Sequence, residues 1–129
     1  MNARPDPVVL AFNLDPIAFK GLEVLCEGIG LRAVSVPREA FHRPVGALAG
    51  LPIPEAEAAA GDGFQDAMLV MCGLDEQRFD TFLKALRASA LPRIPLKAVL
   101  TPYNALWSAV QLHAELRREH ESMAGGGTK

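Results

Sequence analysis

The sequence has few of the residues that chemistry at a protein site usually requires. It contains 2 cysteines, 3 histidines, 1 tryptophan and 1 tyrosine among 129 residues. Cys26 and Cys72 lie in apolar stretches and do not form a C-x-x-C pair, the spacing typical of zinc sites and redox centres. We therefore interpret both as reduced core residues, and the sequence predicts neither a disulfide framework nor a zinc half-site.

The sequence also lacks an excess of one charge and a long apolar run. The 13 Lys and Arg against 15 Asp and Glu give a net charge of -2 and a pI of about 5.9, and the basic residues are scattered. This excludes the electrostatic footprint of a nucleic-acid-binding protein. No run of about 18 apolar residues could span a membrane, and residues 1–7 lack the apolar segment of a signal peptide. We expect a cytoplasmic protein that binds neither nucleic acid nor a membrane.

Catalytic, cofactor and metal motifs are missing as well. A phosphoacceptor receiver domain would need an acidic pair after its first strand and an aspartate at the end of its third, where this chain has Asn13 and Gly73. His113 and His120 would lie about 10 Å apart along a helix, too far to share one ion without other ligands. No serine or cysteine has neighbours that would activate it. We therefore predict no catalytic residue, no cofactor and no metal.

What the sequence does contain is a repeat. The pattern Leu-Asp-x-x-x-Phe occurs at residues 14–19 and again at 74–79, each time after an apolar run. The pattern Leu-basic-Ala-Val-x-x-Pro occurs at residues 31–37 and again at 96–102. Both copies place an apolar run, a helix start and a second strand in the same order, which indicates a duplicated strand-helix-strand unit.

Two strands are expected in each copy of the repeat. The expected strands are residues 8–12, 31–36, 68–72 and 96–100. The first and third are apolar at every position, as is typical of strands buried on both faces, so they are predicted in the centre of a sheet. The second and fourth each carry a basic residue at the matching position of the repeat, Arg32 and Lys97, which suits an edge strand.

Helices are predicted after the first and third strands. Asp15 and Asp75 precede apolar residues at helical spacing, and their side chains can accept from the free N–H groups of a helix start. A last helix begins either at Thr101, which is followed by a proline, or one turn later at Asn104, and it runs to about residue 122.

The predicted fold class is α/β, with a four-stranded, mainly parallel sheet in the order 2-1-3-4 and helices on both faces. A ferredoxin-like α+β sandwich is the alternative, because it also arises from a doubled strand-helix-strand unit. The two differ at residues 38–66, where a parallel sheet needs a crossover and the ferredoxin-like fold needs only a hairpin. About 29 residues favour the crossover, and one short helix is expected there, in residues 41–51 or 55–60.

The chain has the length of one domain of ordinary size, long enough to bury a core. We expect this domain to cover residues 1–129. Its expected parts are a flexible N-terminus, a first unit, a connection, a second unit with the C-terminal helix, and a disordered tail, at residues 1–6, 8–37, 38–66, 67–123 and 124–129.

Polar side chains follow the strands at residues 13–15, 73–75 and 101–104. The carboxyl ends of parallel strands meet at one end of a sheet, where open α/β folds usually bind ligands. Asn13, Thr101 and Asn104 are therefore candidate contacts for a small metabolite. Helix capping is the competing interpretation of this end, because carboxylates at the helix starts would repel a bound anion.

The last helix has an apolar face that one sheet cannot cover. Apolar residues occupy more than half of its circumference at about 100° per residue. Either residues 38–66 fold over this face, or a second copy or a partner protein does. Trp107 is the candidate anchor of such an interface, because aromatic side chains concentrate interface energy.

A further pattern runs through residues 96–107, Leu-Lys-Ala-Val-Leu-Thr-Pro-Tyr-Asn-x-x-Trp. Together with Leu112, Glu115, Leu116, Glu119 and His120 it resembles a family of small prokaryotic proteins, the domain-of-unknown-function family DUF3783, over about residues 66–123. The resemblance implies a compact strand and helix domain with no assigned activity, cofactor or catalytic residue. The resemblance also makes residues 97–107 a candidate site, because four positions there match the family pattern together: Lys97, Thr101, Asn104 and Trp107.

Two functions are open on the sequence alone. The first is a non-catalytic protein-interaction or regulatory module, with a homodimer through the C-terminal helix as one form. The second is a small-metabolite-binding protein or enzyme with its site at the carboxyl ends of the strands. The candidate ligand or interface positions are Asn13, Lys97, Thr101, Asn104 and Trp107.

Overall fold

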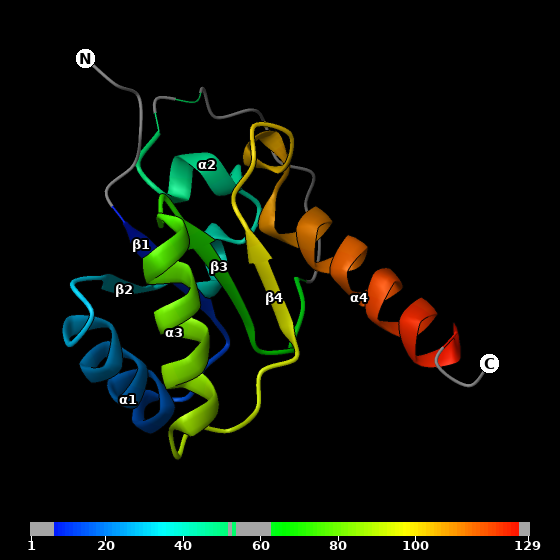
Figure 1. The fold of residues 1–129 in the computed structure, drawn as a ribbon. Helices are drawn as coiled ribbons and strands as arrows, with labels where there is room; N and C mark the ends of the chain where they lie inside the picture. The colour runs from blue at the N-terminus through cyan, green and yellow to red at the C-terminus, as the bar shows by residue number, and fades with distance from the viewer. Residues whose placement is uncertain (1–6, 52, 54–62, 127–129) are drawn as a thin grey trace.

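The computed structural model describes residues 7–51, 53 and 63–126, and for residues 122–126 it describes the backbone alone (Figure 1). The strands are β1 (Val8–Phe12), β2 (Arg32–Ser35), β3 (Met68–Cys72) and β4 (Leu96–Val99). The α-helices are α1 (Pro16–Glu27), α2 (Val45–Leu48), α3 (Glu76–Ala88) and α4 (Ala109–Gly126). Two 3₁₀ segments are η1 (Arg38–Ala40) and η2 (Asn104–Leu106). The predicted N-terminal segment 1–6, the candidate helix at 55–60 and the last three residues of the predicted tail lie outside the described residues.

The four strands form one sheet in the predicted order, β2-β1-β3-β4. β1 pairs in parallel with β2, and β3 pairs in parallel with β4. The two central strands, however, are antiparallel, with Val8 opposite Cys72 and Phe12 opposite Met68. The fold is α/β with a mixed sheet, and the prediction of a mainly parallel sheet is wrong at its central pair.

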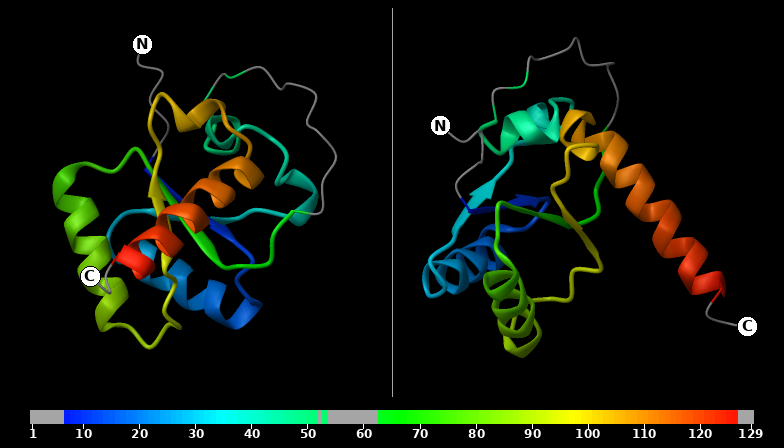
Figure 2. Two further views of the ribbon diagram at one scale, coloured as in Figure 1. Left: turned by 90° about the vertical axis from the view of Figure 1, so that its right-hand side faces the viewer. Right: turned by 45° about the horizontal axis from the view of Figure 1, so that its top comes forward.

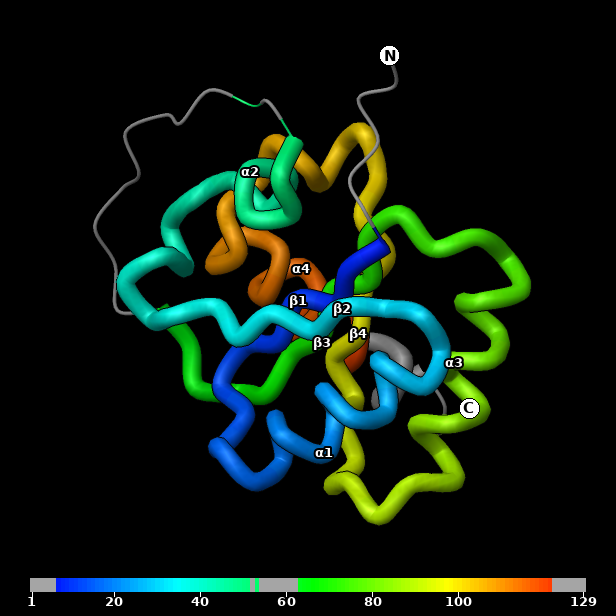
Figure 3. Tube along the Cα trace, turned by 90° about the vertical axis from the view of Figure 1, so that its left-hand side faces the viewer, coloured from blue at the N-terminus to red at the C-terminus, as the bar shows by residue number. Residues whose placement is uncertain are grey.

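Helices cover both faces of the sheet, as predicted. α1 and α3 pack on one face, whereas η1, α2 and α4 pack on the other (Figure 2). Figure 3 views the sheet from its β2 side and shows the same two layers. Strand-helix-strand connections are almost always right-handed. The first unit adds β2 on one side of the central pair, and the second unit adds β4 on the other side. The strands of the second unit also run opposite to those of the first. The two reversals cancel, so two right-handed connections place α1 and α3 on the same face.

The described part of the connection at residues 38–66 packs on one face of the sheet, and the two central strands that the connection joins are antiparallel. Phe41 and Val45, from its first half, are fully buried against the face that α4 also covers. The N–H of Val45 donates to the C=O of Trp107 at 2.8 Å, and the C=O of Phe41 accepts from Val110. Of the connection's two predicted helical segments, 41–51 contains α2.

The ferredoxin-like alternative is not formed either. In a split strand-helix-strand unit another strand lies between the two strands of each unit. Here β1 is hydrogen-bonded to β2, and β3 to β4, so the two strands of each unit are direct neighbours.

Both predicted helix starts are confirmed. Asp15 accepts from the N–H of Ala18 at 2.7 Å, and Asp75 accepts from the N–H of Arg78 at 2.8 Å. These bonds satisfy N–H groups that have no partner within a helix.

The two copies of the repeat differ by one residue in their second strands. Val8 at the start of β1 pairs with Arg32, whereas Met68 at the start of β3 pairs with Leu96 and not with Lys97. A shift of one residue moves a side chain to the other face of a sheet. Lys97 therefore lies on the face that α3 covers, and Arg32 lies on the opposite face.

The last helix begins at Ala109, later than either predicted start. The hydroxyl of Ser108 accepts from the N–H of Gln111 at 3.1 Å and caps it. Trp107 has an extended backbone and its C=O is bound by Val45, so the chain bends here. The apolar residues before the bend lie on η2 and its flank, which makes the apolar face of α4 narrower than predicted.

The connection covers that narrower face. Ala109 and Leu112 are buried in the cluster that contains Phe41, and Trp107 is half-buried beside it. The reason for expecting a partner on the apolar face of the helix is therefore removed. The C-terminal end of α4 extends away from the body of the protein (Figure 2), and the helix ends at Gly126, beyond the predicted start of the tail.

Candidate functional site along the edge of β4

β4 is an edge strand with one side free of sheet partners. The N–H of Leu100 donates to the C=O of Met71 in β3 at 2.9 Å. Because backbone groups alternate in direction along a strand, Ala98 also faces β3. The N–H and C=O groups of Lys97 and Val99 face outward, where a further strand could pair with them.

Asn104 occupies the end of this edge. Its Oδ1 accepts from the N–H of Thr101 at 2.9 Å, and its Nδ2 donates to the C=O of Val99 at 3.0 Å. The side-chain amide thus takes the place of a peptide group in a neighbouring strand. The N–H of Asn104 in turn donates to the hydroxyl of Thr101 at 3.1 Å.

Pro95 precedes β4 and has no N–H to offer. Between these two ends, the open groups of the edge are the N–H and C=O of Lys97 and the N–H of Val99. This short stretch is the part of the edge available to a partner.

A cavity of about 320 Å³ lies between β4 and α4. Four of the five predicted site residues line it: Lys97, Thr101, Asn104 and Trp107. Two apolar residues and two carboxylates of α4 also line it: Leu112, Leu116, Glu115 and Glu119. The structure thus brings together the residues that matched the family pattern, although Asn104 uses its amide within the protein.

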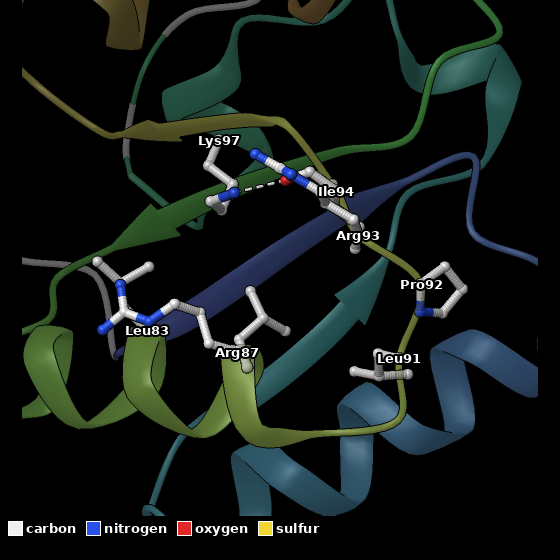
Figure 4. Close-up of a pocket in the computed structure, with 8 residues that line it drawn as sticks. Leu83, Arg87, Leu91, Pro92, Arg93, Ile94 and Lys97 are labelled. Carbon is white, nitrogen blue, oxygen red and sulfur yellow. Dashed lines mark hydrogen bonds between the residues drawn. The ribbon is translucent and has the colours of Figure 1, made fainter.

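A larger cavity of about 580 Å³ lies on the other face of β4, beside α3 (Figure 4). Its cationic residues are Arg87 from α3, Arg93 from the segment before β4, and Lys97 from β4 itself. The remaining lining is formed by Leu83, Leu86, Leu91, Pro92 and Ile94. No carboxylate lines it, and among the described residues no Asp or Glu forms an ion pair with any of the three cations. We call it the basic cavity.

Lys97 borders both cavities. Its Nζ donates to the C=O of Ile94 at 2.5 Å. Burial lowers the pKa of Lys97, and the positive charge of Arg93 lowers it further. A bound anion would relieve the repulsion between these two cations.

Sequence reasoning identified Lys97 but missed Arg87 and Arg93. Their positions show no periodic spacing, and the three side chains come from three different segments of the chain. The two prolines that flank Arg93 were the available signal, because they hold an exposed segment beside the edge.

Asn13 lies at the opposite end of the sheet. It follows β1, which runs antiparallel to β3, so the carboxyl ends of the strands do not meet as expected. Asn13 has a positive φ of 62°, and its Nδ2 donates to the C=O groups of Phe64 and Asp66 at 2.8 and 3.0 Å. It fixes the chain before β3 and does not join the other four candidates.

A polar cluster near that end was not predicted. Asp66 Oδ2 lies 2.8 Å from His113 Nε2 and 3.0 Å from Arg117 Nη1, and Phe64 stacks on the His113 ring at 4.1 Å between centroids. The hydrogen bond with His113, together with Arg117, lowers the pKa of Asp66. These contacts tie the segment before β3 to α4.

Both cysteines are free and buried, as predicted, and burial raises the pKa of Cys26 and of Cys72 to about 12. Within the described part of the chain, no group of three His, Cys, Asp or Glu side chains could hold a metal ion. In that same part, no helix has the length and apolar character needed to cross a bilayer.

Residues 67–123 match the family model of a domain of unknown function, DUF3783. This confirms the resemblance inferred from the sequence, over nearly the same residues. The matched segment contains β3, α3, β4 and most of α4, and therefore the free edge and both cavities. No curated protein and no solved structure matches the chain. The function of the protein is unknown.

Proposed function

We propose that the protein is a non-catalytic interaction module that binds an extended segment of a partner protein along the free edge of β4. The observation that carries this proposal is a cavity on each face of one short edge strand, with Lys97 bordering both. An added strand binds through its backbone and sends alternate side chains to opposite faces. Each cavity would receive every second side chain of the partner.

The reactive side chains of the described residues support a binding role. The thiols are buried and protonated. His113 is held between Asp66 and Phe64, and neither of these two partners is a serine or a cysteine that the imidazole could activate. A homodimer through α4 stays a prediction, although Phe41 and Val45 pack in the same cluster as the apolar face that suggested it. A cytoplasmic location also stays a prediction.

A small anionic metabolite in the basic cavity is the second candidate. Its volume of about 580 Å³ lies within the range of small-molecule sites, about 300 to 1,000 Å³. This candidate differs from the site predicted at the carboxyl ends of the strands, because those ends do not meet. It would need neither the free edge nor the cavity beside α4.

The test uses two proline variants, and each removes one outward N–H from a different edge of the sheet. In Val99→Pro the lost N–H faces away from β3, so the ladder keeps its hydrogen bonds. Ser35→Pro is the matched control, since Ser35 ends β2 and the neighbouring Val36 donates to β1, which leaves the Ser35 N–H facing outward. Circular dichroism and urea unfolding establish that both variants are folded.

The wild-type protein is first used to capture proteins from a lysate. Each captured protein is then identified, purified and titrated against the wild type, Val99→Pro and Ser35→Pro. Val99→Pro is expected to weaken binding of a true edge partner at least about tenfold, because strand addition depends on main-chain hydrogen bonds. Ser35→Pro is expected to bind like the wild type. Equal binding of all three would refute the proposal, and retention of a protein from the lysate is not by itself support.

A further inference from the structure

The basic cavity, on one face of the free edge, has a local excess of positive charge, whereas Glu115 and Glu119 line the cavity on the other face. The whole chain has a net charge of -2, yet of the described residues three cations and no carboxylate line the basic cavity. Arg93 and Lys97 are close enough for the charge of one to lower the pKa of the other. Cations that are partly desolvated and near each other favour an anionic ligand.

The register of β4 determines which partner residue meets this charge. The side chain of Lys97 lies on the α3 face, because its pairing partner Leu69 belongs to the cluster under α3. A partner residue directly opposite Lys97 would place its side chain on that same face, above the basic cavity. The residues before and after it would face the cavity beside α4, where Trp107 and Leu116 supply apolar surface and Glu115 and Glu119 supply carboxylates.

A second copy of this chain fits the edge poorly. Pairing of two β4 strands about a two-fold axis would bring two copies of Lys97, and two of Arg93, to one short interface. Like charges opposite each other destabilise a strand pair. The charge therefore favours a different partner over a homodimer at this edge.

We infer that the partner segment is an extended acidic one, in which Asp or Glu side chains that enter the basic cavity alternate with apolar side chains that enter the cavity beside α4. Arg87 and Arg93 bind the carboxylates, and the outward backbone groups of Lys97 and Val99 pair with the segment. This inference rests on the proposed function and specifies its ligand.

The test uses a blocked peptide of about seven residues that alternates glutamate with valine, the length of an ordinary strand. Three comparison peptides carry lysine for glutamate, glutamine for glutamate, or methyl groups on alternate peptide nitrogens. Binding is measured by anisotropy of a dye on the peptide. Trp107, which is the single tryptophan, reports occupation of the cavity beside α4 through its fluorescence.

We expect the acidic peptide to bind and each comparison peptide to bind at least about tenfold more weakly, because both the charge and the backbone N–H groups contribute. In the protein, R87Q combined with R93Q is expected to give a loss of the same size. The matched control is Lys84→Gln, which removes one positive charge from the exposed side of α3 outside the cavity and is expected to change binding less than about twofold.

Two results would overturn the inference. Equal binding of the glutamine peptide would show that the segment need not be acidic, and the proposed function would survive if Val99→Pro still weakened the native partner. Equal binding of the methylated peptide would indicate an anion site that uses no strand pairing. If neither Val99→Pro nor the arginine pair affects a native partner, the proposed function itself fails.

Discussion

The side-chain amide of Asn104 satisfies the end of β4 from within the protein. It is 8% exposed, and it binds one backbone donor and one backbone acceptor of the edge. The sequence predicts Asn104 and Thr101 as site residues, and a ligand role for them stays a prediction. Their hydrogen bonds close the end of the β4 edge. The backbone groups that face outward from this edge belong to Lys97 and Val99.

Asn104→Ala is expected to lower the free energy of unfolding by about 1 to 3 kcal/mol, because it leaves the N–H of Thr101 and the C=O of Val99 without their partner. Urea unfolding measures the change. Gln111→Ala, at an exposed position of α4, is the control and is expected to stay within about 0.5 kcal/mol. A loss for Asn104→Ala no larger than for the control would show that the amide does not stabilise this turn.

Asp66 gives a pH dependence whose sign follows from its pKa. In the folded state the hydrogen bond with His113 lowers the pKa of Asp66 below its ordinary value of 3.8, so folding favours the carboxylate. The stabilisation is complete above the unfolded pKa and is lost as the pH falls through the folded pKa.

Asp66→Asn is therefore expected to be less stable than the wild type at pH 7 and to differ from it less and less below about pH 4. Since the Asp66 side chain is 42% exposed, the difference at neutral pH should not exceed about 1 kcal/mol. Thermal unfolding between neutral and acidic pH measures it. A difference that grew on acidification would contradict the assigned direction.

At the scale of elements, local signals were sufficient for the helices that follow β1 and β3. A capping aspartate and apolar residues at helical spacing are signals that depend only on residues a few positions apart. Asp15 and Asp75 therefore identified both helix starts. The start of α4 was missed because its cause is not local. The chain bends at Trp107, where Val45 from the connection binds the carbonyl.

The close approach of α2 to η2 depends on Gly46. A Cβ there would lie 2.9 Å from the Cβ of Ala105 and 3.0 Å from its carbonyl oxygen. Gly46→Ala is expected to cost about 1 to 3 kcal/mol of stability through overpacking. Gly28→Ala is the matched control, because its Cβ would meet nothing closer than 3.5 Å. Equal unfolding midpoints in urea for the two variants would show that the elements do not pack this closely.

At the scale of the whole molecule, burial patterns gave the strand order but not the strand directions. A strand apolar at every position reads the same in a parallel and an antiparallel pair, so β1 and β3 could be placed in the centre without their relative sense. The basic cavity was missed for a related reason. Arg87, Arg93 and Lys97 meet only after α3 has packed beside β4.

The antiparallel pair can be tested by cross-linking. Val8 lies opposite Cys72, so Val8→Cys is expected to form a disulfide with it on oxidative refolding in a Cys26→Ala background. In a parallel pair Phe12 would face Cys72, and Phe12→Cys would then cross-link. Mass spectrometry after alkylation identifies the product, and a disulfide formed by the Phe12 variant alone would contradict the antiparallel sheet.

The most direct test of binding along β4 is amide hydrogen exchange, residue by residue, with and without the acidic peptide. The N–H groups of Lys97 and Val99 face outward in the free protein, and we expect saturating peptide to slow their exchange at least about tenfold. The N–H of Ser35, on the other edge, should exchange at an unchanged rate. Unchanged rates at Lys97 and Val99 with the peptide bound would contradict the account.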